Sequence, residues 1–393
     1  MLVMYDALAS GGAPTNRVPR SRAHITHRTM AEQFRERWWP ILFENIALGA
    51  VEVDQFETEF AAAVQQKYAV GVHSGTLGLF LALRAVGVGR GDEVITVGNS
   101  DISTTAAISH CGAVPVLCDI LLSDFTINPE LVEELITRST KAILPVDLYG
   151  HPAHTQALRQ IADRRGLKIV EDAALASGAE DFGLPVGAFA DATVFSFAPF
   201  KPLGSVGHGA TVTTNDEAIA TRLRLLTGYG QGVHSPAAAP GHQTHVAEGY
   251  NMPLDPLEAA LLRVKLPRLR EWTAARRAVA AAYAQKLKGA KLHLPTFRSS
   301  TRPTFRSYTI LVEDQALVYR RLIQSGIEVV LHYVPPIYRQ PVYVNNALRG
   351  SERLPVTEWV TQHLICLPVS VELTGADIEY VIESVREIVQ LRP

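Results

Sequence analysis

Hydrophobic positions along the chain follow two periods, one typical of helices and one typical of buried strands. From about residue 53, apolar side chains at helical spacing alternate with short apolar runs rich in β-branched residues. The pattern predicts helices over 53–68, 77–86, 102–110, 129–137 and 153–165, and strands over 91–97, 113–120, 141–149, 167–173, 192–197 and 208–215. Such alternation is typical of an α/β fold with a buried, mostly parallel central sheet flanked by helices.

The pattern changes after residue 250. Residues 254–287 form a nearly continuous helical pattern, and beyond them it predicts a strand at 307–313, a helix at 315–325, a strand at 327–333 and a terminal helix at 377–391. We therefore expect an N-terminal arm (1–40), a large domain (41–250), a connecting long helix (251–288) and a small C-terminal α+β domain (289–393). The long apolar-poor segment 230–249 is expected to be an active-site or interface loop.

Composition narrows the class of protein. The chain has 393 residues, 47% hydrophobic and 19% charged, and a formal net charge of −2, which argues against binding to nucleic acid or an anionic membrane surface. No apolar stretch reaches the roughly 18 residues of a membrane span, and the irregular, Arg-bearing arm lacks the apolar core of a signal peptide. The three cysteines form no CxxC pair and no metal-ligand spacing, so we expect reduced thiols, a cytoplasmic protein and no metal.

Three segments carry candidate chemistry, and the first is VHSGTLGL. Ser74, Gly75 and Thr76 lie between a predicted strand and a predicted helix. Free backbone amides at a helix start favour a phosphate group. The alternative is a helix cap and a tight turn with no ligand.

In the second segment, KIVEDAALASGA, an apolar strand runs into two carboxylates, Glu171 and Asp172. Ligands of open α/β sheets bind at this end of the strands, and a half-buried carboxylate needs a cationic partner to stay ionised. A protonated pyridine nitrogen is such a partner. The alternative is that Asp172 caps the helix that follows.

The third segment, DATVFSFAPFKPLGSVGHGA, places Ser196 and Lys201 between two strands. Desolvation would lower the pKa of the Lys201 amine and make it a nucleophile toward a carbonyl, whereas most loop lysines are simply solvated. A phosphate cradle, a strand-end acid and a nucleophilic lysine are together the parts that a pyridoxal-phosphate (PLP) enzyme supplies.

With these segments the sequence resembles the DegT/DnrJ/EryC1/StrS family of fold-type I PLP aminotransferases, which act on nucleotide-linked keto-sugars and cyclitols. The matching blocks occur in the family's order over nearly the whole chain after the arm. They include SGTLGLFLALRAVGVGRGDEVITV, KAILPVDLYGHPA, VEDAALASGA, FSFAPFKPLGSVGHGA, EGYNMPLDPLEAALL, SYTILVE and LHYVPPIY.

The resemblance implies a role for each matching residue. Lys201 matches the Schiff-base lysine and Asp172 the acid paired with the pyridine nitrogen, while Gly75, Thr76 and Ser196 match phosphate-binding positions. Asn251 matches an asparagine that reaches the phosphate across a subunit interface, which implies a homodimer with a shared site. His332 and Tyr333 match residues at the substrate end of the pocket, and the implied amino donor is glutamate or glutamine, which converts PLP to its amine form (PMP).

Four residues depart from the family pattern. Asp101 stands where relatives carry an aromatic residue that stacks on the cofactor ring, so this cofactor-contacting position holds an acid. Leu175 replaces a glutamine, His208 an acid and Pro253 an arginine.

These departures leave three functions to compare. The leading one is an aminotransferase of secondary metabolism acting on a keto-sugar nucleotide or a related cyclic ketone. The second is a PLP enzyme that performs a dehydration, elimination, epimerisation or oxidation. The third is a non-catalytic regulatory or binding protein with the same fold.

Overall fold

A seven-stranded sheet forms the centre of the molecule in the computed structural model, which describes residues 17–231, 244–344 and 348–390. Its strands are β1 (Tyr68–Val72), β2 (Glu93–Val97), β3 (Val114–Cys118), β4 (Thr140–Ile143), β5 (Lys168–Asp172), β8 (Ala192–Ser196) and β9 (Ala210–Thr214). They lie in the order β1-β9-β8-β5-β4-β2-β3. Neighbours from β8 to β3 pair in parallel, whereas β9 is antiparallel to both β8 and β1. The predicted α/β fold with a mostly parallel sheet is confirmed.

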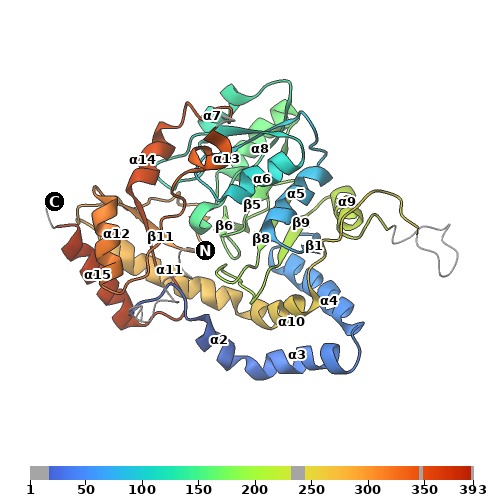
Figure 1. Ribbon diagram of the computed structural model, residues 1–393, viewed down its shortest axis with the longest axis horizontal. Coiled ribbons are helices and arrows are strands. Elements are labelled where there is room, and N and C mark those ends of the chain that lie inside the picture. The colour runs from blue at the N-terminus through green and yellow to red at the C-terminus, as the bar shows by residue number, and fades with distance from the viewer. Residues whose placement is uncertain (1–16, 232–243, 345–347, 391–393) are drawn as a thin grey trace.

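Helices cover both faces of this sheet (Figure 1). They are α4 (Leu48–Ala63), α5 (Gly75–Ala85), α6 (Ile102–His110), α7 (Pro129–Leu135), α8 (Thr155–Arg165) and α9 (Glu217–Thr227). The strands are almost fully buried, because helices on both sides leave neither face to solvent. Helix α9 was not predicted, although Asp216 accepts hydrogen bonds from two amides at its start and gives the signal of a helix cap.

The C-terminal residues build a second apolar cluster around a two-stranded antiparallel sheet, β11 (Tyr308–Leu311) and β12 (Leu364–Leu367). The helices of this part are α10 (Pro256–Lys265), α11 (Leu269–Lys286), α12 (Gln315–Gln324), α13 (Pro341–Val344), α14 (Pro355–His363) and α15 (Gly375–Ile388). A small three-stranded sheet joins β10 (Thr301–Arg302) to β6 (Glu180–Asp181) and β7 (Leu184–Pro185).

Several predicted elements differ from the structure, among them the strand predicted over 141–149, which ends at Ile143. The continuous helix over 254–287 is wrong, because a 3₁₀ turn at Leu266–Arg268 separates α10 from α11. Pro267 lies in that turn, and proline has no amide to donate to the α-helical ladder. The helix predicted over 53–68 ends at Ala63, and β1 begins at Tyr68.

The strand predicted over 327–333 is also wrong. In this segment only isolated bridges occur, Val18 with Ile327 and Val330 with Cys366. The chain then turns at 332–335 ahead of two prolines, which cannot extend a ladder. The turn directs Tyr333 toward the sheet edge described below.

The N-terminal segment is more regular than expected. Residues 1–16 and 232–243 of the predicted arm and loop lie outside the described residues, but α2 (Ala23–Thr29) and α3 (Ala31–Phe43) replace the irregular backbone expected up to residue 40. Phe34, Trp38 and Ile41 lie on one face of α3. Helix α3 lies beside α4 and α10 (Figure 1). Among the described residues, no helix combines the length and apolar character needed to cross a membrane.

Helix α5 lies unusually close to the sheet at Gly78. A Cβ atom there would be 2.8 Å from Val194 Cγ1 and 3.2 Å from Val72 Cγ2. Such distances are shorter than van der Waals contacts, so a side chain at this position must push α5 away from β1 and β8. The position of the α5 N-terminus therefore depends on glycine here.

We expect Gly78→Val to lower the free energy of unfolding by about 1–3 kcal/mol, because overpacking forces the helix off the sheet. The matched control is Gly375→Val in the first turn of α15, where an added Cβ meets nothing within 4 Å and the change should stay within about 0.5 kcal/mol. Urea unfolding of both variants measures the difference, and equal stabilities would contradict the packing argument.

Candidate active site

The turn after β1 places a helix N-terminus at the carboxyl edge of the parallel strands. Ser74 is extended, and its hydroxyl accepts a hydrogen bond from the Leu77 amide at 3.4 Å, so it caps α5 as the alternative interpretation predicted. Gly75 begins the helix, and a Cβ atom there would lie 3.1 Å from Ser196 Cβ. Glycine thus brings the first amides of α5 next to the hydroxyl that ends β8, an arrangement that suits a phosphate group.

Asp172 ends β5 at the same edge and is buried. Its two carboxyl oxygens accept hydrogen bonds from the Ala174 amide and the Thr104 hydroxyl, each at 3.2 Å. Burial raises the pKa of Asp172, while the Ala174 amide and the positive charge of Lys201 lower it. The alternative that Asp172 caps a following helix is wrong, because residues 173–179 form turns.

Lys201 lies in the irregular segment between β8 and β9. Burial is the main cause that lowers the pKa of its amine to about 8, and the nearby charge of Arg306 adds to it, whereas Asp172 and Asp101 raise it. A substantial fraction of this amine is neutral near physiological pH, which is the state that attacks a carbonyl carbon.

These groups converge on one cavity, which we call the strand-edge cavity. It has a volume of about 310 Å³. It is lined by seven of the predicted site residues, namely Gly75, Thr76, Asp101, Asp172, Ser196, Lys201 and Tyr333. The sheet topology explains the convergence, because β1, β2, β5 and β8 all end at this edge.

His332 and Tyr333 lie in the turn that ends the segment predicted as a strand. Their rings are stacked, with centroids 4.8 Å apart, and the backbone oxygen of His332 accepts a hydrogen bond from the Tyr149 hydroxyl at 2.5 Å. Tyr333 lines the strand-edge cavity, whereas His332 is not among its lining residues. Burial, together with the charges of Arg306 and Arg20, lowers the pKa of His332 to about 3, so its imidazole is neutral.

Asn251 is not brought into the strand-edge cavity of this chain. It is exposed and forms an isolated bridge with Gly228 beside the end of α9. A role for Asn251 at the site therefore requires a second subunit, and it stays a prediction.

The four departures from the family pattern have identifiable environments. Asp101 caps α6, because its carboxylate accepts a hydrogen bond from the Ser103 amide at 2.9 Å, and it also lines the cavity. Leu175 is buried in the cavity wall, where His208 also lies. Pro253 forms a bridge with Val72, the last residue of β1.

Two residues of this region were missed. Thr104 is buried on α6, and its hydroxyl donates a hydrogen bond to Asp172. Arg306 precedes β11, and its positive charge lowers the pKa of both Lys201 and His332. The helical pattern of 102–110 could have indicated that Thr104 faces the sheet. No sequence signal places Arg306 beside Lys201, since the two residues come from different parts of the chain.

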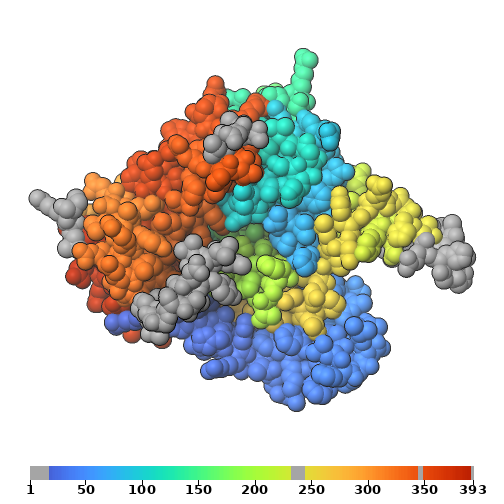
Figure 2. Space-filling view, viewed as in Figure 1, coloured from blue at the N-terminus to red at the C-terminus, as the bar shows by residue number. Residues whose placement is uncertain are grey.

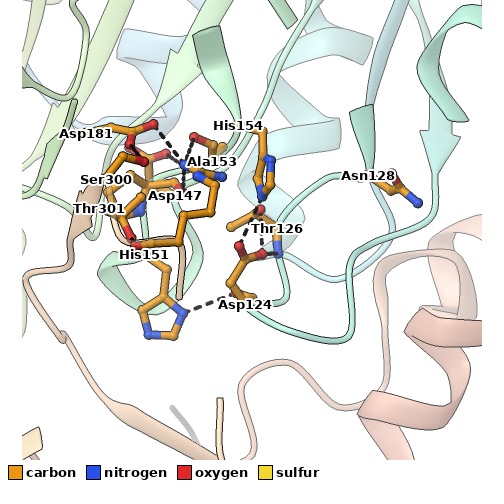
Figure 3. A network of polar contacts seen from close by, with 12 residues as sticks. Asp124, Thr126, Asn128, Asp147, His151, Ala153, His154, Asp181, Ser300 and Thr301 are labelled. Carbon is orange, nitrogen blue, oxygen red and sulfur yellow. Dashed lines mark hydrogen bonds and ion pairs between the residues drawn. The ribbon is translucent and has the colours of Figure 1, made fainter. Parts of the chain in front are cut away.

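A second polar network lies beside the cavity, around the segment that follows β4 (Figure 3). Asp147 accepts a hydrogen bond from the Ala153 amide at 2.8 Å, while Asp124 contacts His154 at 3.2 Å. Asp181 accepts from Ser300 at 2.8 Å and pairs with Arg298. Burial, with the negative charge of Glu171, raises the pKa of Asp147. In the described part of the chain, no group of three or more His, Cys, Asp or Glu side chains could hold a metal ion.

Comparisons with known proteins agree with this geometry. The model of the DegT/DnrJ/EryC1/StrS aminotransferase family matches residues 32–386. A Streptomyces venezuelae dTDP-3-amino-3,4,6-trideoxy-alpha-D-glucose transaminase is 40% identical over 380 residues, covering 96% of this chain and 98% of the relative.

Solved structures give the same assignment. The crystal structure of S. venezuelae DesV in complex with a ketimine intermediate superimposes with a TM-score of 0.89 at 36% identity, covering 96% of this chain and all of that one. NtdA from Bacillus subtilis with bound cofactor PMP has a TM-score of 0.83 at 26% identity, covering 96% of this chain and 85% of that one. The chain therefore belongs to the DegT/DnrJ/EryC1/StrS aminotransferase family and is a PLP-dependent aminotransferase.

Proposed function

We propose that the enzyme moves an amino group from glutamate or glutamine to the keto carbon of a nucleotide-linked sugar or a related cyclic ketone, with Lys201 holding the cofactor. The observation that carries the proposal is the convergence of Lys201, Asp172 and the α5 N-terminus on one cavity. The dTDP-sugar transaminase among the relatives supports the class of acceptor.

The residues of the strand-edge cavity fit PLP in three respects. The amides of Gly75 and Thr76 with the Ser196 hydroxyl suit its phosphate, and the glycine leaves room for a close approach. The buried Asp172 carboxyl suits a protonated ring nitrogen, which would hold it ionised despite the burial that raises its pKa. The Lys201 amine suits the aldehyde.

When bound, PLP supplies an electron sink for the substrate carbon that loses a proton. Asp172 would keep the ring nitrogen protonated, and Thr104 fixes the Asp172 carboxyl in place. When its amine is not bonded to the cofactor, Lys201 Nζ would be a base placed to take a proton from the substrate carbon and to return it. The stacked His332 and Tyr333 rings would exclude water from this side.

A homodimer with a shared site is part of the proposal. Asn251 is exposed in the single chain, and exposed apolar side chains also occur at the α3–α4 turn, in the blue region along the lower edge of Figure 2. Phe43 is 66% exposed and Ile46 85% exposed. Such a patch is typical of a subunit interface. Sedimentation of the holoenzyme at twice the mass of one chain is the expected result.

The location of the enzyme is proposed as the cytoplasm. Cys111, Cys118 and Cys366 are free and buried, which suits a reducing compartment. Secondary metabolism is proposed as its setting, on the relatives that act on deoxyamino sugars.

The first prediction concerns Lys201→Ala. This variant should lack the visible absorption of the lysine-bound cofactor and should lose at least roughly 100-fold in transamination, because the cofactor anchor and the base are both removed. The control variant Lys288→Ala changes an exposed lysine and should keep both the visible absorption and the transamination activity. Absorption spectra with PLP and product analysis with L-glutamate and a dTDP-linked keto-sugar measure this. Full activity of Lys201→Ala would sink the proposal.

The second prediction concerns Asp172→Asn, which keeps the shape of the side chain but removes its charge. The rate of the half-reaction with L-glutamate should fall roughly 100-fold or more, because a neutral amide cannot hold the ring nitrogen protonated. The visible band should remain, since Lys201 is unchanged. Stopped-flow decay of that band measures the rate, and a loss of less than 3-fold would show that Asp172 has another role.

A third prediction follows from the lowered pKa of Lys201. Only the neutral amine attacks the aldehyde, so the rate at which the cofactor-free protein captures PLP should rise with pH and level off above about 8. Arg306→Gln removes a positive charge that lowers this pKa, and the midpoint should move to higher pH. The rate of band formation between pH 6 and 10 tests both statements; a midpoint that does not move would exclude Arg306 as a cause.

The same spectra distinguish transamination from the alternative reactions predicted from Asp101 and Leu175. The Asp101 carboxylate is used as the cap of α6, so its presence at the cavity has a structural reason that does not require new chemistry. Failure of every amino-acid donor to bleach the band would favour an elimination, dehydration, epimerisation or oxidation. Failure to bind PLP at all would favour a regulatory protein.

A further inference from the structure

A second cavity lies on the other side of Lys201, between α2, the start of α11 and residues 369–372. It has a volume of about 60 Å³. We call it the cationic cavity, because its lining residues include Arg20, Lys265, Arg276 and Arg306 in addition to Lys201. The lysine thus separates this cavity from the strand-edge cavity.

The cations of this cavity are removed from water. Lys265 is 5% exposed and Arg276 8% exposed, and burial lowers the pKa of Lys265 to about 8 and those of Arg276 and Arg306 to about 10. Arg306 and Arg276 also lie close enough to repel each other. Holding such charges together is unfavourable unless an anion offsets them.

Several of their donors have no hydrogen-bond partner. The buried Nη1 atom of Arg276 and the buried Nε atoms of Arg306 and Arg20 make no hydrogen bond within the described residues. Arg276 does donate through Nη2 to the Pro202 backbone oxygen at 2.8 Å, which holds its guanidinium at the cavity wall. A buried guanidinium donor that remains unpaired is costly, so these atoms point to a missing acceptor.

The protein itself supplies little negative charge here. Among the described residues that line the cavity, Glu372 is the one carboxylate. Its oxygens already accept hydrogen bonds from the Thr26 hydroxyl at 2.7 Å and the Ser370 hydroxyl at 2.5 Å. Outside the lining, a Glu328 carboxylate oxygen lies 4.0 Å from Arg20 Nε, so the unpaired donors of Arg276 and Arg306 are the ones open to an acceptor from a ligand.

From this geometry we propose that the cationic cavity binds a carboxylate of the amino-acid donor and so selects donors by that group. Planar guanidinium groups match a carboxylate through paired hydrogen bonds. The volume of about 60 Å³ suits one such group, and it is far below the roughly 300–1,000 Å³ of pockets that enclose larger ligands such as a nucleotide. A carboxylate held here would lie in a cavity that Lys201 also lines.

The same positive charge reaches the substrate end of the site. Arg306, Arg20 and Lys201 all contribute, after burial, to the lowered pKa of His332. The charges of this cavity therefore act on the imidazole that stacks on the Tyr333 ring. This inference rests on the proposed transamination, since it assigns the donor of that reaction to a position.

The test measures how the donor concentration affects bleaching of the visible band of the holoenzyme. Arg306→Gln and Arg276→Gln should each raise the half-saturating L-glutamate concentration roughly 10- to 100-fold, the effect of losing a charged hydrogen bond. Wild type should discriminate against one of the two amides of the donor, L-glutamine or L-glutamate α-amide. Both variants should lose most of that discrimination, which a merely structural role would not change.

Three controls accompany these variants. Arg270→Gln removes an exposed arginine from the same helix α11 and should leave donor saturation unchanged. Arg306→Lys keeps the charge and should recover part of the affinity. The half-saturating concentration of a dTDP-linked keto-sugar should stay within about 3-fold in all of them. If Arg276→Gln fails to fold, the half-buried Arg306→Gln decides the test.

The outcomes separate this proposal from the proposed function. An intact band with unchanged donor saturation in Arg306→Gln would overturn the carboxylate subsite and leave the transamination standing. If dTDP inhibits Arg306→Gln more weakly than wild type while donor saturation is unchanged, the cavity binds a phosphate group. That result would also overturn the carboxylate subsite. A wild-type protein without a band, or without bleaching by any donor, contradicts the proposed function itself.

Discussion

The site depends on holding an amine and a carboxyl group out of water at one edge of a sheet. Lys201 and Asp172 shift each other's pKa, and each is also shifted by burial. The sheet makes this possible, because Asp172 on β5 pairs with Val194 on β8 and the chain reaches Lys201 soon after β8 ends. A change in the spacing of these strands would therefore change the charges of both groups.

Close packing of the helices on the sheet also positions residues at the edge that holds Lys201 and Asp172. Gly78 lets α5 lie against β1 and β8, and Gly75 brings the first turn of α5 to Ser196. On α6, the Asp101 cap fixes the helix start, and Thr104 in its first turn donates to Asp172. Asp101, which departs from the family pattern, thus has a structural use that also places a hydrogen bond on the buried acid.

The sequence predicts this edge well because local patterns determine it. Apolar strands that end in Asp172 or Ser196 and a helix that begins at Gly75 are visible in short segments, and parallel strands bring such ends together. Prediction from the sequence fails where contacts between distant parts of the chain determine the conformation. Residues 327–333 have the composition of a strand, but they find only single bridges, to Val18 and Cys366, and turn toward the cavity instead. Arg20 and Arg306 reach Lys201 from segments whose local patterns indicate no charge cluster.

Lys201 lines both cavities, and charged groups of both shift the pKa of its amine. Asp172 and Asp101 on the strand-edge side raise the pKa of the amine, and Arg306 on the cationic side lowers it together with burial. A carboxylate bound near Arg306 would neutralise that positive charge and make the protonated amine more favourable. Donor binding would then increase the basicity of Lys201 at the stage when the lysine must accept a proton. On the proposed assignment, the arginines would connect recognition of the donor with proton transfer, which a neutral binding pocket of the same shape could not do.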